Sequence, residues 1–290
     1  MSTPTPQAEE LKALGNAMYA KGKFGAAIDA YTDAVLLCPR WLPVILNRAL
    51  CYRKKKQWNK VKDDCLKALD IDRESIKGNY MLGLSLIAER NYLEAVRRLQ
   101  KALENARSDG ALIQDEIWRE LARAKYLQWE IDAAARASKV DAVEAKLAEM
   151  GLLDSDGGNK GGVIDLVHGD GMDVYTFTSD EKQTLLEMVA SERAPDDSKY
   201  DPPDCFCCVL TFEVFRDPVV TKSGNSYERS AVETHLQRVG NFDPITREPM
   251  TQADLIPNVG LRNAAHNWLN EHAWAYADII KPDAPLGGED

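Results

Sequence analysis

The sequence of 290 residues has no long hydrophobic run, few cysteines and few histidines. No stretch approaches the roughly 20 apolar residues that span a bilayer, so we expect neither a membrane-spanning segment nor a membrane partner. Six cysteines are too few for a disulfide framework in a chain of this length, which favours the cytosol or the nucleus. The first twelve residues lack a basic region followed by an apolar one, so we expect no secretory signal.

The charge is unevenly distributed along the chain. In total, 46 acidic residues face 36 basic ones, and the net charge of −10 argues against nonspecific binding of nucleic acid. Residues 1–110, however, contain 19 basic and 13 acidic residues, a net charge of +6, whereas residues 151–290 contain 11 and 25, a net charge of −14. The front of this acidic protein therefore suits an anionic partner.

The front of the chain repeats itself every 34 residues. Leu14-Gly15 aligns with Arg48-Ala49 and Leu82-Gly83, and the same step relates Ala27, Val61 and Ala95, then Tyr31, Cys65 and Leu99, then Ala34, Ala68 and Ala102. Alternating small and large residues at this period resemble the tetratricopeptide repeat, a helix-turn-helix unit. We expect three units over residues 8–109. An apolar stripe at helical spacing over residues 113–131 predicts a helix that caps the third unit.

Four polar residues of these units form a predicted anion site. Lys12 and Asn16 lie one turn apart on the first helix, Asn47 opens the first helix of the second unit, and Lys77 opens that of the third. They resemble the carboxylate clamp with which tetratricopeptide domains hold the free carboxyl end of heat-shock chaperones. Two ammonium groups and two amides can make charge-assisted hydrogen bonds to a terminal carboxylate. The alternative, ordinary solvated lysines, predicts no ligand.

One position departs from the clamp pattern. Many such clamps have an arginine four residues after the last lysine, and this chain has Met81 there, with Tyr80 beside it. We expect these two side chains to make apolar contacts with the bound peptide.

From Pro202 onward, short apolar segments alternate with turns. Ser223-Gly224-Asn225, between apolar strand residues, predicts a hairpin, helical periodicity follows over residues 228–239, and Asn258 can cap a final helix. Three cysteines and three histidines leave a zinc site open, but a cross-braced zinc domain needs eight ligands. We therefore expect no metal and interpret the cysteines as small buried side chains.

This region resembles the U-box, a module with the RING scaffold in which hydrogen bonds and ion pairs replace the zinc ions; LQRVGNFDPITREPMTQADLIPN carries the likeness. The resemblance implies that Leu210, Phe212 and Pro244 dock a ubiquitin-conjugating enzyme. It also implies that Arg247 bridges that enzyme and ubiquitin and favours the reactive geometry, with no covalent intermediate on the ligase and no cofactor. For Leu210, a place in the core is an equally good interpretation.

The two ends together resemble the chaperone-linked ubiquitin ligases. We expect a mainly α-helical protein with three domains: a tetratricopeptide-repeat solenoid (8–109), a helical, acidic, Gly-containing linker region (110–200), and a small α+β, RING-like, metal-free U-box (201–276). The implied function is ubiquitination of chaperone-bound clients, with chaperone tails, a conjugating enzyme and ubiquitin as partners, and the family implies a homodimer. The alternatives are a noncatalytic co-chaperone or scaffold with a degenerate U-box, and a zinc-dependent RING-like ligase.

Overall fold

The structure, a computed structural model, describes residues 4–149, 184–185, 187–189 and 202–279. These residues belong to two compact units. The first contains the chain up to Gln128 together with Tyr276 onward, and the second extends from Trp129 to Ala275. About half of the expected linker region, residues 150–183, 186 and 190–200, lies outside the described residues. None of the described helices is long and apolar enough to cross a membrane.

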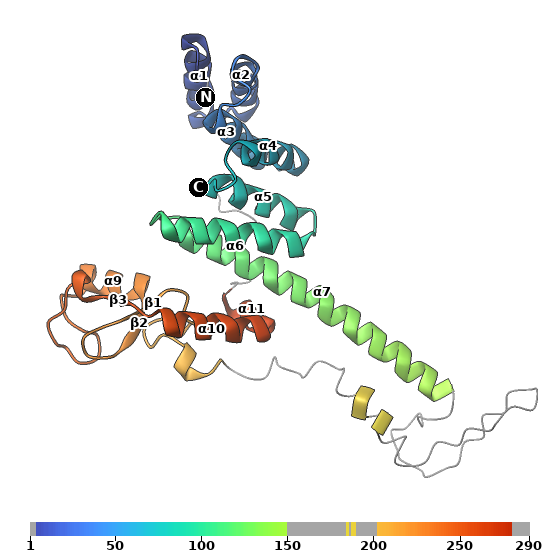
Figure 1. The fold of residues 1–290 in the computed structure, drawn as a ribbon, viewed down its shortest axis with the longest axis vertical. Helices are drawn as coiled ribbons and strands as arrows, with labels where there is room; N and C mark the ends of the chain where they lie inside the picture. The colour runs from blue at the N-terminus through green and yellow to red at the C-terminus, as the bar shows by residue number, and fades with distance from the viewer. Residues whose placement is uncertain (1–3, 150–183, 186, 190–201, 280–290) are drawn as a thin grey trace, which may run out of the picture. The chain divides into compact units, whose positions relative to one another are not determined.

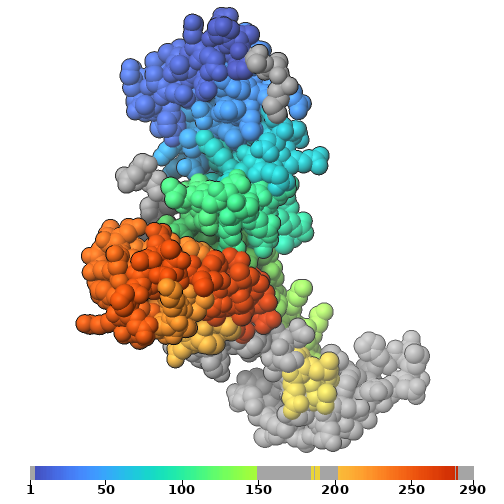
Figure 2. Space-filling view, turned by 60° about the vertical axis from the view of Figure 1, so that its left-hand side comes forward, coloured from blue at the N-terminus to red at the C-terminus, as the bar shows by residue number. Residues whose placement is uncertain are grey.

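Three consecutive helix pairs build the first unit, as the 34-residue period predicts (Figure 1). In the space-filling view they follow one another from the blue amino-terminal pair to the green third pair (Figure 2). The pairs are α1 (Pro6–Ala20) with α2 (Phe24–Leu37), α3 (Leu42–Lys54) with α4 (Trp58–Ile71), and α5 (Ile76–Ala88) with α6 (Tyr92–Ser108).

Complementary side-chain sizes fix the packing inside each pair. A Cβ atom on Gly15 would lie 2.4 Å from the Tyr31 ring, and one on Gly83 would lie 2.6 Å from Leu99 Cγ. At the matching positions the second pair has Ala49 and Cys65, both completely buried. The largest partner therefore faces a glycine and the smallest faces an alanine, which explains the repeated small residues.

The turn inside each pair also repeats. Gly22, Lys56 and Arg90, each 34 residues apart, have positive φ angles of 69°, 55° and 60°. Around each of them, two backbone N–H groups return to carbonyls of the preceding helix, as in Lys23 to Met18 at 2.9 Å. This left-handed ending satisfies carbonyls that would otherwise lack partners.

The predicted capping helix exists and is longer than expected. Helix α7 (Gln114–Glu149) follows the third pair (Figure 1), and Gln114 Nε2 donates to the carbonyl of Ala106 on α6 at 3.3 Å. Its apolar stripe is buried from Ile117 to Ala124, whereas Ile131 is exposed. The first unit also includes α11 (Tyr276–Ile279), where the Tyr276 hydroxyl accepts a hydrogen bond from Lys125 Nζ at 3.0 Å.

The second unit contains the predicted hairpin and both predicted helices. Strand β1 (Pro218–Val220) pairs antiparallel with β2 (Ser226–Glu228) and with β3 (Ile256–Pro257), in the order β2-β1-β3. Helix α9 (Arg229–Arg238) follows the hairpin, and α10 (Val259–Glu271) begins at Asn258, whose side chain accepts from Leu261 N. Strand β3 was not predicted, because two residues that include a proline carry no alternating pattern.

Candidate functional site

Three of the four predicted clamp residues form one row of hydrogen bonds. Lys77 Nζ donates to Asn47 Oδ1 at 3.2 Å, and Asn47 Nδ2 donates to Asn16 Oδ1 at 3.3 Å. The row ends at Tyr31, whose hydroxyl donates to the same Asn16 oxygen at 2.7 Å. The first helices of the three units, α1, α3 and α5, thus each contribute one polar side chain to one surface. Asn47 does so from the middle of α3, not from its start as expected.

The fourth residue, Lys12, has partners of its own. Its Nζ lies 3.4 Å from Glu9 Oε2, three residues earlier on α1, and 4.8 Å from the centroid of the Trp41 ring. A cation above an aromatic face is attracted by the ring. Trp41 and Glu9 therefore hold the ammonium group, and Glu9 occupies one of its three donors.

Burial tunes two groups of the row. It lowers the pKa of Lys77, and the nearby positive charge of Arg53 lowers it further. It raises the pKa of Tyr31 to about 12, so the phenol keeps its proton at neutral pH. Because burial and Arg53 both disfavour the charged form of Lys77, an acidic ligand at this surface would restore a favourable partner for its ammonium group.

The predicted peptide contacts of Tyr80 and Met81 are at odds with their burial. Met81 is 1% exposed and Tyr80 is 4% exposed, because α5 is surrounded by neighbouring helices and buries nine of its thirteen residues. The Tyr80 hydroxyl donates to Glu116 Oε1 on α7 at 2.6 Å. Both side chains therefore pack inside the repeat stack, and neither offers a free apolar surface to a peptide.

The predicted docking residues lie on two loops of the second unit that have the same conformation. The first loop, residues 207–214, is closed by a bridge between Cys207 and Val214, and the second loop, residues 242–249, by one between Phe242 and Pro249. In each loop the second residue donates its backbone N–H to the seventh, at 2.9 Å in both cases. In each, the sixth residue donates back to the second and has a positive φ. Those sixth residues are Phe212 (58°) and Arg247 (61°).

In each loop, the side chain of the second residue accepts a hydrogen bond from the backbone of the same loop. Cys208 Sγ accepts the N–H of Leu210 at 3.5 Å, and Asp243 Oδ1 accepts the N–H of Ile245 at 2.9 Å. A threonine hydroxyl at the fifth position likewise accepts the N–H of the seventh residue in both loops. A buried thiol and a buried carboxylate thus do the same structural work.

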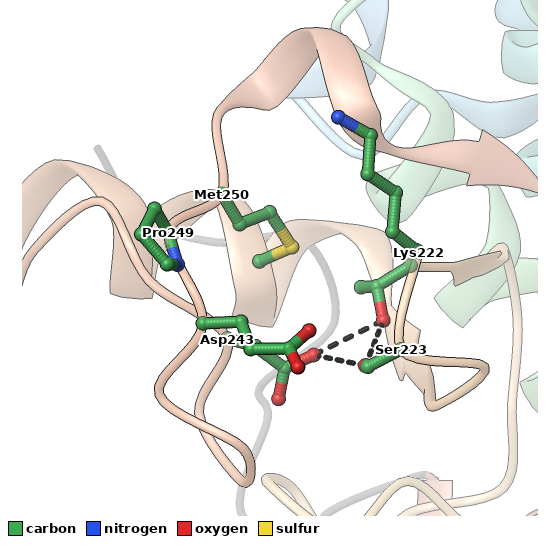
Figure 3. Close-up of a pocket in the computed structure, with 7 residues that line it drawn as sticks. Lys222, Ser223, Asp243, Pro249 and Met250 are labelled. Atoms are coloured by element: carbon green, nitrogen blue, oxygen red, sulfur yellow. Dashed lines mark hydrogen bonds between the residues drawn. The ribbon is translucent and has the colours of Figure 1, made fainter.

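The Asp243 side chain accepts more hydrogen bonds than that of Cys208, and Asp243 is 2% exposed. Its carboxylate accepts hydrogen bonds from three hydroxyls, those of Thr221, Ser223 and Tyr227, at 2.7 to 3.0 Å. Figure 3 shows Asp243 pointing toward Ser223 while Lys222 extends away from it. Burial opposes ionisation, but the donors, Ser223 first among them, outweigh it and hold the pKa of Asp243 well below its usual range.

Cys208 also anchors the start of α9. Its Sγ accepts the N–H of Glu228 at 3.2 Å, and the Glu228 carboxylate accepts the N–H groups of Arg216 and Asp217. The interpretation of the cysteines as buried small side chains is right for Cys208 and wrong for Cys205, which is exposed. Within the part of the chain that the structure describes, no three His, Cys, Asp or Glu side chains are arranged to hold a metal ion.

The outer faces of the two loops are apolar and accessible. Phe212 is 85% exposed, Ile245 56% and Leu210 36%, while Pro244 is half-buried and Arg247 is exposed. Core filling, the alternative for Leu210, does not fit this exposure. Exposed apolar side chains gathered on short loops are typical of a docking surface for another protein.

Sequence reasoning missed two participants. Tyr31 entered the sequence analysis only as a repeat position, which Cys65 and Leu99 hold in the other units, and its hydroxyl group is what those two residues lack. Ile245 occupies in the second loop the position of Leu210 in the first, and a 35-residue offset between Thr211-Phe212-Glu213 and Thr246-Arg247-Glu248 was the available signal.

Comparison with known proteins gives matches to the U-box region alone and to nearly the whole chain. The U-box domain family matches residues 202–274. A protein of Arabidopsis thaliana named E3 ubiquitin-protein ligase CHIP is 40% identical over 275 residues, 93% of this chain and 95% of that protein. The human WD repeat, SAM and U-box domain-containing protein 1 is 37% identical over 70 residues, 24% of this chain and 15% of that protein.

Two solved tetratricopeptide structures are also similar to part of the chain. The Sgt2 domain from Aspergillus fumigatus is 29% identical, with a TM-score of 0.40 over 46% of this chain and 85% of that one. The first such domain of RPAP3, solved with the HSP90 peptide SRMEEVD, is 26% identical, with a TM-score of 0.38 over 41% of this chain and 90% of that one.

Proposed function

The chain belongs to the CHIP family of U-box E3 ubiquitin-protein ligases, and from that membership we propose a division of labour between its two ends. The repeats bind the acidic carboxyl-terminal tail of a heat-shock chaperone. The U-box recruits a ubiquitin-conjugating enzyme and ubiquitinates the chaperone or its client. The observation that carries the proposal for the front end is the hydrogen-bonded row of Asn16, Asn47 and Lys77.

The polar groups that this surface offers to a ligand are hydrogen-bond donors, which supports an anionic ligand. Lys12 and Lys77 are donors only, and the Asn16 and Asn47 oxygens already accept hydrogen bonds within the row. A carboxylate is an acceptor only, so it complements such a surface, and each charge-assisted hydrogen bond adds about 1.5–3 kcal/mol. The net charge of +6 over residues 1–110 supports an acidic tail around that carboxylate.

The two loops support docking of the conjugating enzyme. Leu210, Phe212 and Pro244 would bury their apolar surface against it, and apolar anchors carry most of the affinity of a small interface. Arg247, which is exposed and has a left-handed backbone conformation, would donate from its planar guanidinium group to the enzyme and to ubiquitin together. The ligase then contributes positioning alone: a client lysine attacks the thioester carbonyl, and the conjugating-enzyme thiolate leaves.

Assembly and location are further parts of the proposal. We propose a homodimer, supported by the family resemblance, and light scattering of the full chain would measure its mass directly. We also propose a cytosolic, and in part nuclear, location, which all six cysteines being free supports.

A single reconstituted reaction tests both ends. It contains the full chain, activating and conjugating enzymes, ubiquitin, ATP, and a carrier protein with or without a tail ending in Glu-Glu-Val-Asp. Lys12→Ala should weaken tail binding at least tenfold and remove ubiquitination of the tailed carrier, while unanchored chains still form. Phe212→Ala and Pro244→Ala should stop all chain formation and leave tail binding intact.

The controls are residues of the same type outside both sites. Lys21→Ala removes an exposed lysine at the end of α1, and Leu36→Ala removes an exposed apolar side chain on α2. Unchanged tail affinity in Lys12→Ala would overturn the clamp. Normal chain formation by both Phe212→Ala and Pro244→Ala would overturn the docking surface.

A further inference from the structure

We propose that Tyr31 is a positioning residue of the tail site: its hydroxyl holds the Asn16 side-chain amide with the oxygen inward and the nitrogen outward, and so makes the site selective for a carboxylate over an uncharged chain end. This inference rests on the proposed function, because it concerns how the same site recognises its ligand. Tyr31 lies on α2, the second helix of its unit, and is not one of the four predicted clamp residues.

The local packing delivers the Tyr31 hydroxyl to Asn16. The Tyr31 side chain is 1% exposed and belongs to the core with Ala27, Ala34 and Val44. Its ring lies over Gly15, where an added Cβ would be only 2.4 Å away. Because Gly15 immediately precedes Asn16, the space left by the missing side chain lets the ring pass the α1 backbone and end at the neighbouring amide.

The hydrogen bonds give the Asn16 amide one orientation. Its Oδ1 accepts from the Tyr31 hydroxyl at 2.7 Å and from Asn47 Nδ2 at 3.3 Å, which uses both lone pairs of the oxygen. Asn47 is itself oriented by Lys77, an obligatory donor, whose Nζ lies 3.2 Å from the Asn47 oxygen. If the Asn16 amide turned over, its NH₂ group would face the Asn47 NH₂ group, donor against donor.

Of the two hydrogen bonds that Asn16 Oδ1 accepts, the one from Tyr31 is shorter and therefore stronger. Burial raises its pKa to about 12, so the hydroxyl hydrogen is present to donate at neutral pH. Asn16 itself is exposed. Both hydrogens of its NH₂ group are consequently turned toward the surface on which a ligand arrives.

The outward NH₂ group discriminates between chain ends. A free terminal carboxylate has only acceptors, so it is compatible with every donor that Asn16, Lys12 and Lys77 present. An amidated end carries two N–H hydrogens that would meet donors. Without the Tyr31 hydroxyl, Asn16 keeps only the 3.3 Å bond, can turn its oxygen outward, and can accept from such an amide.

Tyr31→Phe tests the inference, because it removes the hydroxyl and keeps the ring over Gly15. Calorimetric titration of the full chain compares two peptides ending in Glu-Glu-Val-Asp, one with a free carboxyl end and one with a carboxamide end. Tyr31→Phe should weaken binding of the acid peptide about tenfold and leave the amide peptide within twofold, so the preference for the acid falls about tenfold. Tyr19→Phe is the matched control: Tyr19 packs against Phe24 in the same repeat, and no hydrogen bond joins its hydroxyl to the row among the described residues.

The outcomes separate this inference from the proposed function. If the unmodified chain fails to prefer the acid peptide, the proposed tail site is wrong. If it prefers the acid and Tyr31→Phe keeps the same preference, or weakens both peptides equally, the positioning role is wrong. Should Tyr31→Phe lose helical structure, Asn16→Asp decides: it keeps an acceptor for Tyr31 but replaces the outward NH₂ group with an oxygen. That variant should bind the amide peptide at least as tightly as the acid, and a retained acid preference would overturn the inference.

Discussion

At the scale of single residues, hydrogen-bond partners decide what each side chain of the tail site can do. Helical spacing was sufficient to place Asn16, Asn47 and Lys77 on one surface. Their separations of 31 and 30 residues fall three and four short of the 34-residue period, and positions three or four apart share one face of a helix. Spacing could not reveal that Met81 is buried, because that depends on how tightly α5 is covered by its neighbours. Nor could it reveal the orientation of an amide, which is set by partners from other helices.

Glu9 competes with the ligand for Lys12 across 3.4 Å. Glu9→Gln should therefore tighten binding of the acidic tail two- to fivefold, because an exposed ion pair of this kind is worth about 0.2–1 kcal/mol. Peptide titration followed by the fluorescence of Trp41, whose ring lies under the Lys12 ammonium, measures the change.

Glu10→Gln is the matched control for the Glu9 prediction, because it removes the same charge from the adjacent, exposed position on α1. An equal gain in both variants would show that the effect is long-range electrostatics and not competition at Lys12.

At the scale of elements, the repeat pattern predicted more than the number of helices. The pairs Gly15 with Tyr31, Ala49 with Cys65, and Gly83 with Leu99 show that the larger side chains on the second helix are matched by glycine and the smallest by alanine. In the second unit, hydrophobic patterning found the hairpin, α9 and α10. Hydrophobic patterning could not show that residues 207–214 and 242–249 share a backbone conformation, because hydrogen bonds determine this conformation and they produce no hydrophobic periodicity.

Gly83→Ala should destabilise the protein by about 1–3 kcal/mol, although alanine favours helices, because the new methyl group meets Leu99 Cγ at 2.6 Å. Gly25→Ala is the control: Gly25 is exposed on α2 with nothing within 4 Å of an added Cβ, so it should stabilise by about 0.4–1 kcal/mol. Urea unfolding followed by helical circular dichroism measures both.

A double-mutant cycle tests the size rule for the Gly83 pair itself. Leu99→Cys in the Gly83→Ala background recreates the combination of Ala49 and Cys65, so the two losses should fall short of additivity by at least about 0.5 kcal/mol. Strict additivity would show that the two positions do not share one packing constraint.

At the scale of the whole molecule, the sequence shows that positive and negative charges are concentrated at opposite ends of the chain. Which of these charges can act on a partner depends on the structure. Residues 1–110, with a net charge of +6, lie within the first unit and hold the tail site, whereas residues 151–290 carry −14 and include the U-box. Composition could assign a sign to each end. It could not identify the charges that are already compensated, such as Arg48, which makes two 2.7 Å hydrogen bonds to the buried carboxylate of Asp64.

This separation predicts a salt effect on the rate of tail binding. Raising the ionic strength from 0.05 to 0.5 M shortens the Debye length, so the association rate constant for an acidic tail peptide should fall about fivefold or more. The dissociation rate constant should change less, because Asn16 and Asn47 are neutral and Lys77 is half-buried. Stopped-flow fluorescence measures both rates, and a salt effect confined to dissociation would contradict this account.

The shared loop conformation has a consequence for how the ligase end tolerates mutation. Phe212 and Arg247 occupy backbone positions that glycine and asparagine adopt at little cost and β-branched residues adopt poorly. In a saturation screen that scores abundance and ligation separately, Gly and Asn at these two positions should give abundant but inactive protein, whereas Val and Ile should reduce abundance as well. Substitutions at these two positions would then separate the requirements of folding from the requirements of ligation.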